Sequence, residues 1–255
     1  MQHFKTKYKD TNFRDTFSNI QKCLRLNDWE EIGDGTHFLI FEMIGLFSFR
    51  EWSLQQSIDF MYEFLSKLNI KPDYVTMHKD KYEEWKSLYS KYEIEIRIDN
   101  ECVWSDGDIG GYCTEFYKDD IEIGNIVNTL GNCIDIGFGL ERLLTVTNNI
   151  KSKTKLEILE DTVISLIDSG VKVGNNKSSY ILKKLITESV LLGSERTEDD
   201  FNKMRDKIKT SYILYQKNKT KLKYKDKDSS FWLDTFGIDE NRITDYDLII
   251  NKLDY

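Results

Sequence analysis

The pattern of apolar and polar residues changes near residue 139. Before that point, apolar side chains occur in short runs or at every second position, which is typical of strands. Beyond it they recur at every third or fourth position, which is typical of helices. This segregation predicts an α+β fold with an antiparallel sheet. The clearest expected strands are residues 74–78, 94–98, 113–117 and 121–127, with a loop at 106–111.

Three further segments of the first half have their own patterns. Residues 54–68 carry apolar side chains on one helical face and predict an amphipathic helix, and residues 79–92 predict a surface helix. Apolar residues within 17–26 also have helical spacing, so a helix is expected there. Residues 38–49 are apolar and aromatic with a break at Gly45, which predicts two strands joined by a turn.

The second half is expected to be a small helical domain. Leucine and isoleucine spacing predicts helices at 155–168 and 180–192. The polar stretch near residue 150 is a plausible linker. We therefore expect two domains, residues 1–150 and residues 151–255.

Composition narrows the class of protein. The chain has 255 residues, 40% of them hydrophobic, which is enough for a sizeable core, and a net charge of −8, which argues against a general nucleic-acid coat. No apolar run is long enough for a membrane span, and the first residues lack a secretory pattern, so a cytoplasmic protein is expected. Four separated cysteines and three histidines form no local zinc motif, so no protein-built metal site is expected.

The block Ile134–Leu144, IDIGFGLERLL, combines groups that bind charged ligands. Asp135 ends an apolar run, Gly137 and Gly139 leave the backbone open to close approach, and Arg142 falls in the first turn of an expected helix. A solvent-facing turn is the alternative interpretation of Asp135, because turns favour aspartate.

The expected strand at 121–127 supplies a second polar group. Strand alternation places Glu122 and Gly124 on one face, and Asn125 and Val127 on the other. Asn125 then needs a partner on a mostly buried face, which Asp135 could share. A carboxylate beside an amide suits an ammonium group, and an arginine beside glycines suits a phosphate. The pattern indicates an amino acid next to a nucleotide.

The order of the motifs resembles the alanyl-tRNA synthetase family of class II aminoacyl-tRNA synthetases. FEMIGLFSF (41–49) resembles its motif 2, VWSDGDIGGYCTEFY (103–117) its tryptophan loop, IEIGNIV (121–127) its amino-acid strand and GFGLERLL (137–144) its motif 3. SYILKKLI (179–186) and FWLDTFGI (231–238) resemble landmarks of its acceptor-stem domain. The resemblance covers about residues 15–240. It implies a class II antiparallel sheet flanked by helices, followed by a small helical domain.

The resemblance also implies roles for matching residues. Asp135 would hold the α-ammonium of the substrate, beside a small pocket lined by Asn125 and Val127 and closed by Trp104. ATP would be bound by the remaining matching residues: Arg142 on the phosphates, Phe47 or Phe49 on adenine, Gly137 and Gly139 at the turn, and Glu115 as a candidate ligand of the accompanying Mg²⁺. Core packing is the alternative for each aromatic ring, and a surface strand position is the alternative for Glu115.

The implied activity is ATP-dependent formation of an aminoacyl adenylate, from alanine or another small amino acid, and transfer to a tRNA 3′ end. The family has an arginine before the motif 2 strand, where this chain has Thr36 and His37, and Arg25 or Arg50 is the candidate replacement. Where the family has a tryptophan, Gly124 is expected to leave space in the pocket. Two alternatives stay open: transfer to a carrier protein or a metabolite, and a non-catalytic amino-acid or nucleotide sensor.

Contacts with tRNA are expected in the second domain. Asn175 and Asp234 fall near the family's acceptor-stem positions, with a loop asparagine and a helix cap as the alternatives. Every second residue from Lys217 to Lys227 is lysine, so an extended segment would direct Lys217, Lys219 and Lys221 to one side, toward successive phosphates. A solvated charge run is the alternative. The sequence does not indicate an oligomeric state.

Overall fold

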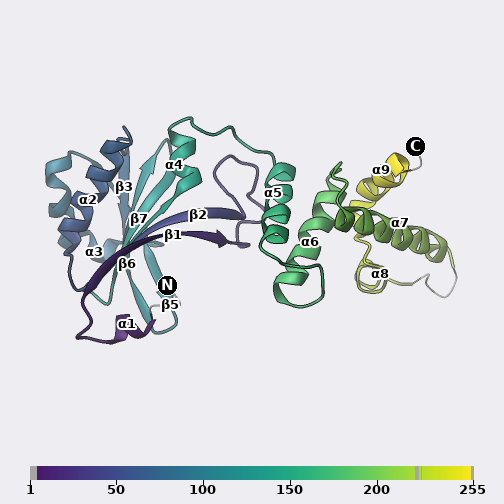
Figure 1. Ribbon diagram of the computed structural model, residues 1–255, viewed down its shortest axis with the longest axis horizontal. Coiled ribbons are helices and arrows are strands. Elements are labelled where there is room, and N and C mark those ends of the chain that lie inside the picture. Colours follow the sequence, from purple (N-terminus) through teal and green to yellow (C-terminus); the bar gives the residue numbers. More distant parts are fainter. Residues whose placement is uncertain (1–4, 222–223, 225, 254–255) are drawn as a thin grey trace. The chain divides into compact units, whose positions relative to one another are not determined.

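The chain folds into two compact units, Met1–Ser152 and Lys153–Tyr255. We describe them from a computed structural model that covers residues 5–221, 224 and 226–253 (Figure 1). The first unit holds a sheet and its covering helices, and the second consists of helices. None of the helices in the described ranges combines the length and the apolar character that a membrane span requires.

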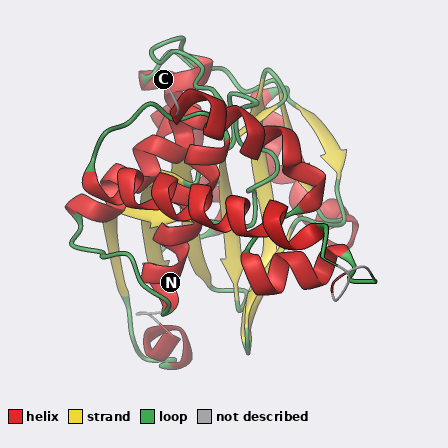
Figure 2. Ribbon diagram, turned by 90° about the vertical axis from the view of Figure 1, so that its right-hand side faces the viewer, coloured by secondary structure: helices red, strands yellow, loops and turns green. Residues whose placement is uncertain are grey.

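The first unit is built on a mixed, mainly antiparallel sheet with eight strands among the described residues (Figure 2). The strand order is β1-β2-β8-β7-β6-β3-β4, and β5 pairs with β6. Only β3 and β4 run parallel. The strands are β1 (Asp15–Leu24), β2 (Ile40–Phe49), β3 (Tyr74–Met77), β4 (Glu95–Ile98), β5 (Val103–Asp106), β6 (Ile109–Lys118), β7 (Ile121–Thr129) and β8 (Cys133–Gly139). The expected α+β class II fold is confirmed.

The first two strands differ from the prediction. Residues 15–24 form the edge strand β1 instead of a helix, and residues 40–49 form one strand, β2, instead of two. The two pair antiparallel over ten residues. This pairing overrides the local spacing of Phe17, Ile20 and Leu24, because backbone hydrogen bonds to β2 satisfy the strand. Gly45 causes no turn; it faces Asn19 across the pair.

Helices cover one face of the sheet. Helix α2 (Leu54–Lys67), predicted from the sequence, starts at a capping box formed by Ser53 and Gln56 and packs its buried Ile58, Met61 and Leu65 against the sheet. Helix α3 (Lys79–Trp85) and the 3-10 helix η2 (Lys86–Tyr92) follow, and Trp85 and Tyr89 join the same core. This core contains Ile134, Ile136 and Phe138 of β8, so the alternate residues of that strand face the other side.

A bulge in β7 changes the expected alternation. Phe116 pairs with Gly124, but Tyr117 pairs with Glu122, so Ile123 is an extra residue. The prediction that Glu122 and Asn125 lie on opposite faces is therefore wrong: the two side chains are hydrogen-bonded, with Nδ2 of Asn125 3.3 Å from Oε1 of Glu122. Helix α4 (Leu140–Val146) follows β8, and the short helix α1 (Lys5–Lys9) precedes β1.

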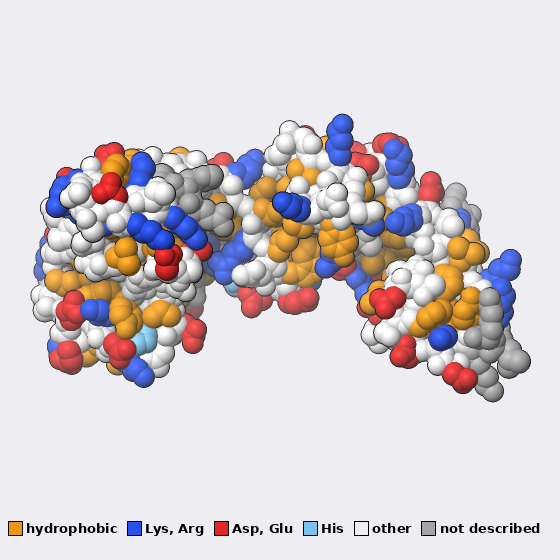
Figure 3. Space-filling model, turned by 90° about the horizontal axis from the view of Figure 1, so that it is seen from below, with side chains coloured by type: hydrophobic (Ala, Val, Ile, Leu, Met, Phe, Trp, Pro, Cys, Tyr) orange, Lys and Arg blue, Asp and Glu red, His pale blue; other side chains and the backbone are white. Residues whose placement is uncertain are grey.

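The second unit is helical, as predicted. Its helices are α5 (Lys155–Asp168), α6 (Lys177–Leu191), α7 (Asp199–Lys219), α8 (Ser229–Phe236), the 3-10 helix η4 (Glu240–Arg242) and α9 (Ile243–Leu253). Its buried residues include Leu185 of α6, Phe201 of α7 and Trp232 of α8. On the face drawn in Figure 3, lysine and arginine side chains lie scattered between acidic and apolar ones.

The extended lysine row is not present in the part of this segment that the structure describes. Lys217 and Lys219 lie in the last turn of α7, where residues two apart point in different directions. The Lys219 ammonium pairs with the Glu240 carboxylate, and Lys221 Nζ donates to Asn218 Oδ1 at 2.8 Å. Lys223 and Lys225 lie outside the described residues.

Candidate active site

On the face of the sheet opposite α2, the predicted site residues form rows that run across the strands. The strand register places Phe47 beside Asp135, Asp135 beside Val127, and Val127 beside Cys113. The neighbouring row runs through Gly45, Gly137, Asn125, Glu115 and Thr76. Residues adjacent in a row have Cβ atoms about 5 Å apart. Five strands, β2, β8, β7, β6 and β3, thus contribute to one continuous surface.

Asp135 is a buried carboxylate, not a turn former. Its relative exposure is 8%, and among the described residues none donates a hydrogen bond to it. Burial therefore raises the pKa of Asp135 to about 7. A buried carboxylate without a partner is costly, and an ammonium group from a ligand would compensate that cost.

Helix α1 covers the Asp135 end of this face. Tyr8 is 1% exposed, its ring lies 4.8 Å from that of Phe49, and its buried hydroxyl has no hydrogen-bond partner among the described residues. Burial, and next the Asp135 carboxylate, raise the pKa of Tyr8. Trp104 packs beside this cluster and beside Val127. A hydroxyl and a carboxylate that have no hydrogen-bond partner among the described residues thus lie in one buried, mostly aromatic cluster.

Arg50 holds α1 in place. Its guanidinium donates to the backbone oxygen of Tyr8 at 2.7 Å, of Phe13 at 3.4 Å and of Lys7 at 3.5 Å. Two ion pairs, Lys5 with Asp106 and Lys9 with Asp108, join α1 to the β5–β6 hairpin. Arg50 is therefore occupied by the backbone and is not a replacement for the motif 2 arginine.

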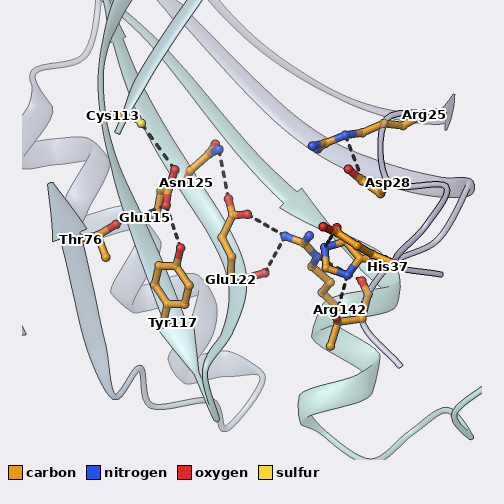
Figure 4. Close-up of polar contacts among 12 residues, drawn as sticks. Arg25, Asp28, His37, Thr76, Cys113, Glu115, Tyr117, Glu122, Asn125 and Arg142 are labelled. Carbon is orange, nitrogen blue, oxygen red and sulfur yellow. Dashed lines mark hydrogen bonds and ion pairs between the residues drawn. The ribbon is translucent and has the colours of Figure 1, made fainter. Parts of the chain in front are cut away.

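Further along β8, an open cavity of about 160 Å³ lies on the same face. Gly137, Gly139 and Arg142, which the resemblance assigns to ATP, line it, and so does Asn125, which the resemblance assigns to the amino acid. Arg142 Nη1 lies 2.7 Å from Oε2 of Glu122, and the same carboxylate accepts from Asn125 (Figure 4). Gly139 lies four positions after Asp135, a strand length of about 13 Å. The buried Asp135 cluster and the cavity are thus successive parts of one face of the sheet.

Arg25 is the residue that sequence reasoning undervalued. It follows the end of β1, lines the same cavity as Arg142, and its Nε lies 3.1 Å from Oδ2 of Asp28 (Figure 4). The cavity therefore has an arginine on each side, although Thr36 and His37 occupy the aligned position. A strand prediction for residues 15–24 would have placed Arg25 beside β2 and its motif.

Gly124 leaves no extra space for a substrate. A Cβ atom at this position would lie 2.7 Å from Cδ1 of Phe138 and 2.9 Å from the backbone oxygen of Gly137. Phe138, which packs into the core, already fills the volume. The expectation of a larger pocket is wrong for this reason.

The structure places neither Phe47 nor Phe49 in the cavity. The two are 4% and 1% exposed and pack with Tyr8, Phe13 and Phe17 at the Asp135 end. Their predicted contact with adenine does not fit this burial. Phe38 and Phe41 line the cavity instead.

Glu115 is part of a polar cluster and not a surface strand residue. Its carboxylate accepts hydrogen bonds from Tyr117 at 2.9 Å and from Thr76 at 3.3 Å. Burial, and next the Glu122 carboxylate, raise its pKa. Glu115 is not among the residues that line the cavity, so its predicted contact with the Mg²⁺ of ATP has no support from position.

The predicted tRNA residues of the second unit are on its surface. Asn175 precedes α6 and accepts from Lys183 Nζ at 3.1 Å. Asp234 is exposed within α8, whose N-cap is Asp228, so Asp234 is not a helix cap. Their roles in tRNA binding stay predictions.

Comparison with known proteins identifies the family. Residues 1–230 match the family model described as tRNA synthetases class II (A). The chain belongs to this class II tRNA synthetase family. It is 28% identical to the alanine–tRNA ligase of Buchnera aphidicola subsp. Baizongia pistaciae over 74% of the chain and 29% of that protein. It is 26% identical to that of Tropheryma whipplei, over 76% of the chain and 30% of the relative.

The class II tRNA synthetase relatives are much longer than this chain. A third, the alanine–tRNA ligase of Francisella tularensis subsp. tularensis, is 27% identical over 69% of the chain and 29% of the relative. The chain thus spans less than a third of the length of the curated relatives it matches.

Proposed function

We propose that the chain joins a small amino acid, alanine in the first instance, to ATP and transfers the resulting aminoacyl group to a tRNA 3′ end. One observation carries the proposal: the buried carboxylate of Asp135 and the two arginines of the cavity share one face of the sheet. The names of the relatives, alanine–tRNA ligases, agree with it.

The amino acid would bind at the Asp135 end. Its α-ammonium would pair with the Asp135 carboxylate, which supplies the charge that the buried site otherwise lacks. Asn125 and Val127, adjacent to Gly137 and Asp135 in the rows, would contact its remainder. Trp104 and Tyr8 pack over this end of the face, so an amino acid with a small side chain is the expected substrate.

ATP would bind in the cavity with its phosphates between Arg25 and Arg142. Phe38 or Phe41 would supply the face for adenine, and Gly137 and Gly139 let the ligand approach the backbone. Glu122 and Glu141 also line the cavity and would hold the Mg²⁺ that accompanies ATP. Magnesium would offset the phosphate charge near these acids.

The chemistry then requires positioning instead of a protein nucleophile. The amino-acid carboxylate attacks the α-phosphorus of ATP, a new P–O bond forms, and pyrophosphate leaves with the electrons of the broken bond. Arg25 and Arg142 would stabilise the charge that develops on the α-phosphoryl oxygens. The tRNA 3′ hydroxyl then takes the acyl group and releases AMP. Alignment of the two substrates contributes most of the rate enhancement.

ATP–pyrophosphate exchange with each of the twenty amino acids tests the proposal. We expect exchange with alanine or another small amino acid, followed by charging of the matching tRNA. Exchange without charging would indicate a carrier protein or a metabolite as the acceptor. No exchange with any amino acid would contradict the proposed activation and leave a sensor as the interpretation.

A further inference from the structure

Two cysteines that are distant in sequence meet beside the amino-acid pocket. Cys102 precedes β5 and Cys113 lies in β6, and the backbone N–H of Cys113 donates to the oxygen of Cys102 at 3.0 Å. Glu115, two residues along β6, projects from the same face as Cys113. The Sγ atoms of both cysteines and a carboxylate oxygen of Glu115 all lie within 4.8 Å of one another. We call these three residues the thiol–carboxylate cluster.

The cluster is enclosed and polar at its centre. Cys102 is 0% exposed and Cys113 is 3% exposed. Thr76 Oγ1 lies 3.1 Å from Cys102 Sγ and 3.3 Å from Glu115 Oε2. Cys113 Sγ lies 3.6 Å from Glu115 Oε1 (Figure 4). Val127 and Trp104 form an apolar wall around the sulfur atoms. Three metal-ligating side chains thus converge on one point in a shell that excludes most water.

We propose that the thiol–carboxylate cluster binds one thiophilic divalent cation, with Zn²⁺ as the ion of choice. Two sulfurs and a carboxylate oxygen are ligands that zinc accepts, whereas magnesium and calcium prefer oxygen alone. In tetrahedral coordination with bonds of about 2.0–2.3 Å, ligand atoms lie about 3.3–3.8 Å apart. The ligand atoms lie within 4.8 Å of one another, and shifts of about 1 Å or less per side chain would bring them to this spacing.

Three protein ligands leave one coordination position for a water or for the Thr76 hydroxyl. This hydroxyl already contacts Cys102 and Glu115. The ion would link the start of β5 to β6. It would also stiffen the wall of the proposed amino-acid site, because Cys113 pairs with Val127 and Val127 pairs with Asp135. The role is independent of the proposed enzymatic function, since it concerns metal content and stability.

Metal analysis of the intact chain tests the proposal. Protein incubated with Zn²⁺ and then desalted should retain about one zinc per chain, and excess chelator should lower its melting temperature by several degrees. Co²⁺ in place of zinc should give the near-ultraviolet absorption of sulfur–cobalt charge transfer. Cys102→Ser and Cys113→Ser should each lose the zinc and the absorption band.

Cys23→Ser is the matched control, because Cys23 is outside the cluster on β1, and it should keep both signals. If a serine variant fails to fold, Glu115→Gln supplies the test: both sulfurs remain, and the affinity for Zn²⁺ should fall about 10–100-fold. Three results would overturn the proposal. The first is wild-type protein that retains less than about 0.1 zinc per chain. The others are serine variants that bind zinc like wild type, and a Cys102–Cys113 disulfide in place of metal binding.

Discussion

At the scale of single residues, the most informative group is the Asp135 carboxylate. Folding buries it among aromatic rings, and no described residue donates a hydrogen bond to it. Stability alone would select against such a group, because a buried charge without a partner costs several kcal/mol. A ligand that brings a positive charge, as proposed above, would offset this cost.

This cost predicts that Asp135→Asn stabilises the protein. Burial raises the pKa of Asp135 to about 7. At low pH the folded protein therefore holds a neutral carboxyl, whose burial costs little free energy. The destabilisation caused by its charge grows as the pH rises toward 7. The variant should therefore unfold like wild type near pH 4 and should gain about 1–3 kcal/mol at pH 8. Urea unfolding at the two pH values measures this.

Asp73→Asn is the control with the opposite sign. The Lys118 ammonium and the Asp119 backbone N–H lower the pKa of Asp73, so its charged form favours the fold. That variant should lose a little stability at pH 8 and none at low pH. A loss of stability in Asp135→Asn at pH 8 would show that the carboxylate has a structural partner.

At the scale of helices and strands, the sequence predicted elements whose pattern agrees with their packing. Helix α2 has one apolar face and a capping box, and the expected strand 113–117 lies within β6, although β6 begins at Ile109, inside the segment expected to be a loop. The strand β1 could not be identified in this way: its side chains are largely exposed, so spacing carries little information, and its structure depends on pairing with β2. The Ile123 bulge likewise depends on the partner strand.

The candidate site was predictable where its residues share a short block or match a family motif. Asp135, Gly137, Gly139 and Arg142 share one short block, and the sequence grouped them. Arg25, Cys102 and Tyr8 join the site through strand register and the position of α1, which no local pattern encodes. The same limit explains why the sequence assigned the adenine contact to Phe47 or Phe49. Their burial depends on the position of α1, which no local pattern encodes.

The end of β1 gives a prediction for ATP. Arg25→Ala should raise the Michaelis constant for ATP and lower kcat/KM in pyrophosphate exchange by about 10–100-fold, because a charged contact to phosphate is lost. Stability should fall by about 1 kcal/mol or less, since the Arg25 side chain is 55% exposed, although that of Asp28 is only 13% exposed.

Arg97→Ala is the matched control for Arg25, because Arg97 also forms a surface ion pair, with Glu95, outside the cavity lining. It should leave exchange unchanged. If Arg25→Ala exchanges pyrophosphate like wild type, the cavity has only one functional arginine, and the charge that binds ATP comes from Arg142.

At the scale of the whole molecule, a sheet unit and a helical unit occupy a chain that spans less than a third of its relatives. The chain is acidic, with a net charge of −8, yet Lys203–Lys227 carries ten basic residues against two acids. Contacts with tRNA phosphates would therefore depend on a few lysines of the helical unit and would weaken as salt rises.

The helical positions of these lysines predict a small effect. Because Lys217 and Lys219 point in different directions on α7, the double change to Gln should reduce the slope of log affinity against log salt by about one, not two. Filter binding of tRNA at several salt concentrations measures the slope. Lys86→Gln in the first unit, where Lys86 pairs with Glu83, is the control and should leave the slope unchanged. An unchanged slope in the double variant would support the alternative interpretation, a solvated charge run that does not contact tRNA.

The most direct test of the account is the pair of Michaelis constants in pyrophosphate exchange for wild type and Asp135→Asn. We expect the constant for the amino acid to rise about 100-fold, as a buried charged contact to the ammonium is lost, while the constant for ATP stays within about two-fold. Equal losses for both substrates, or no loss for the amino acid, would contradict an ammonium site at Asp135.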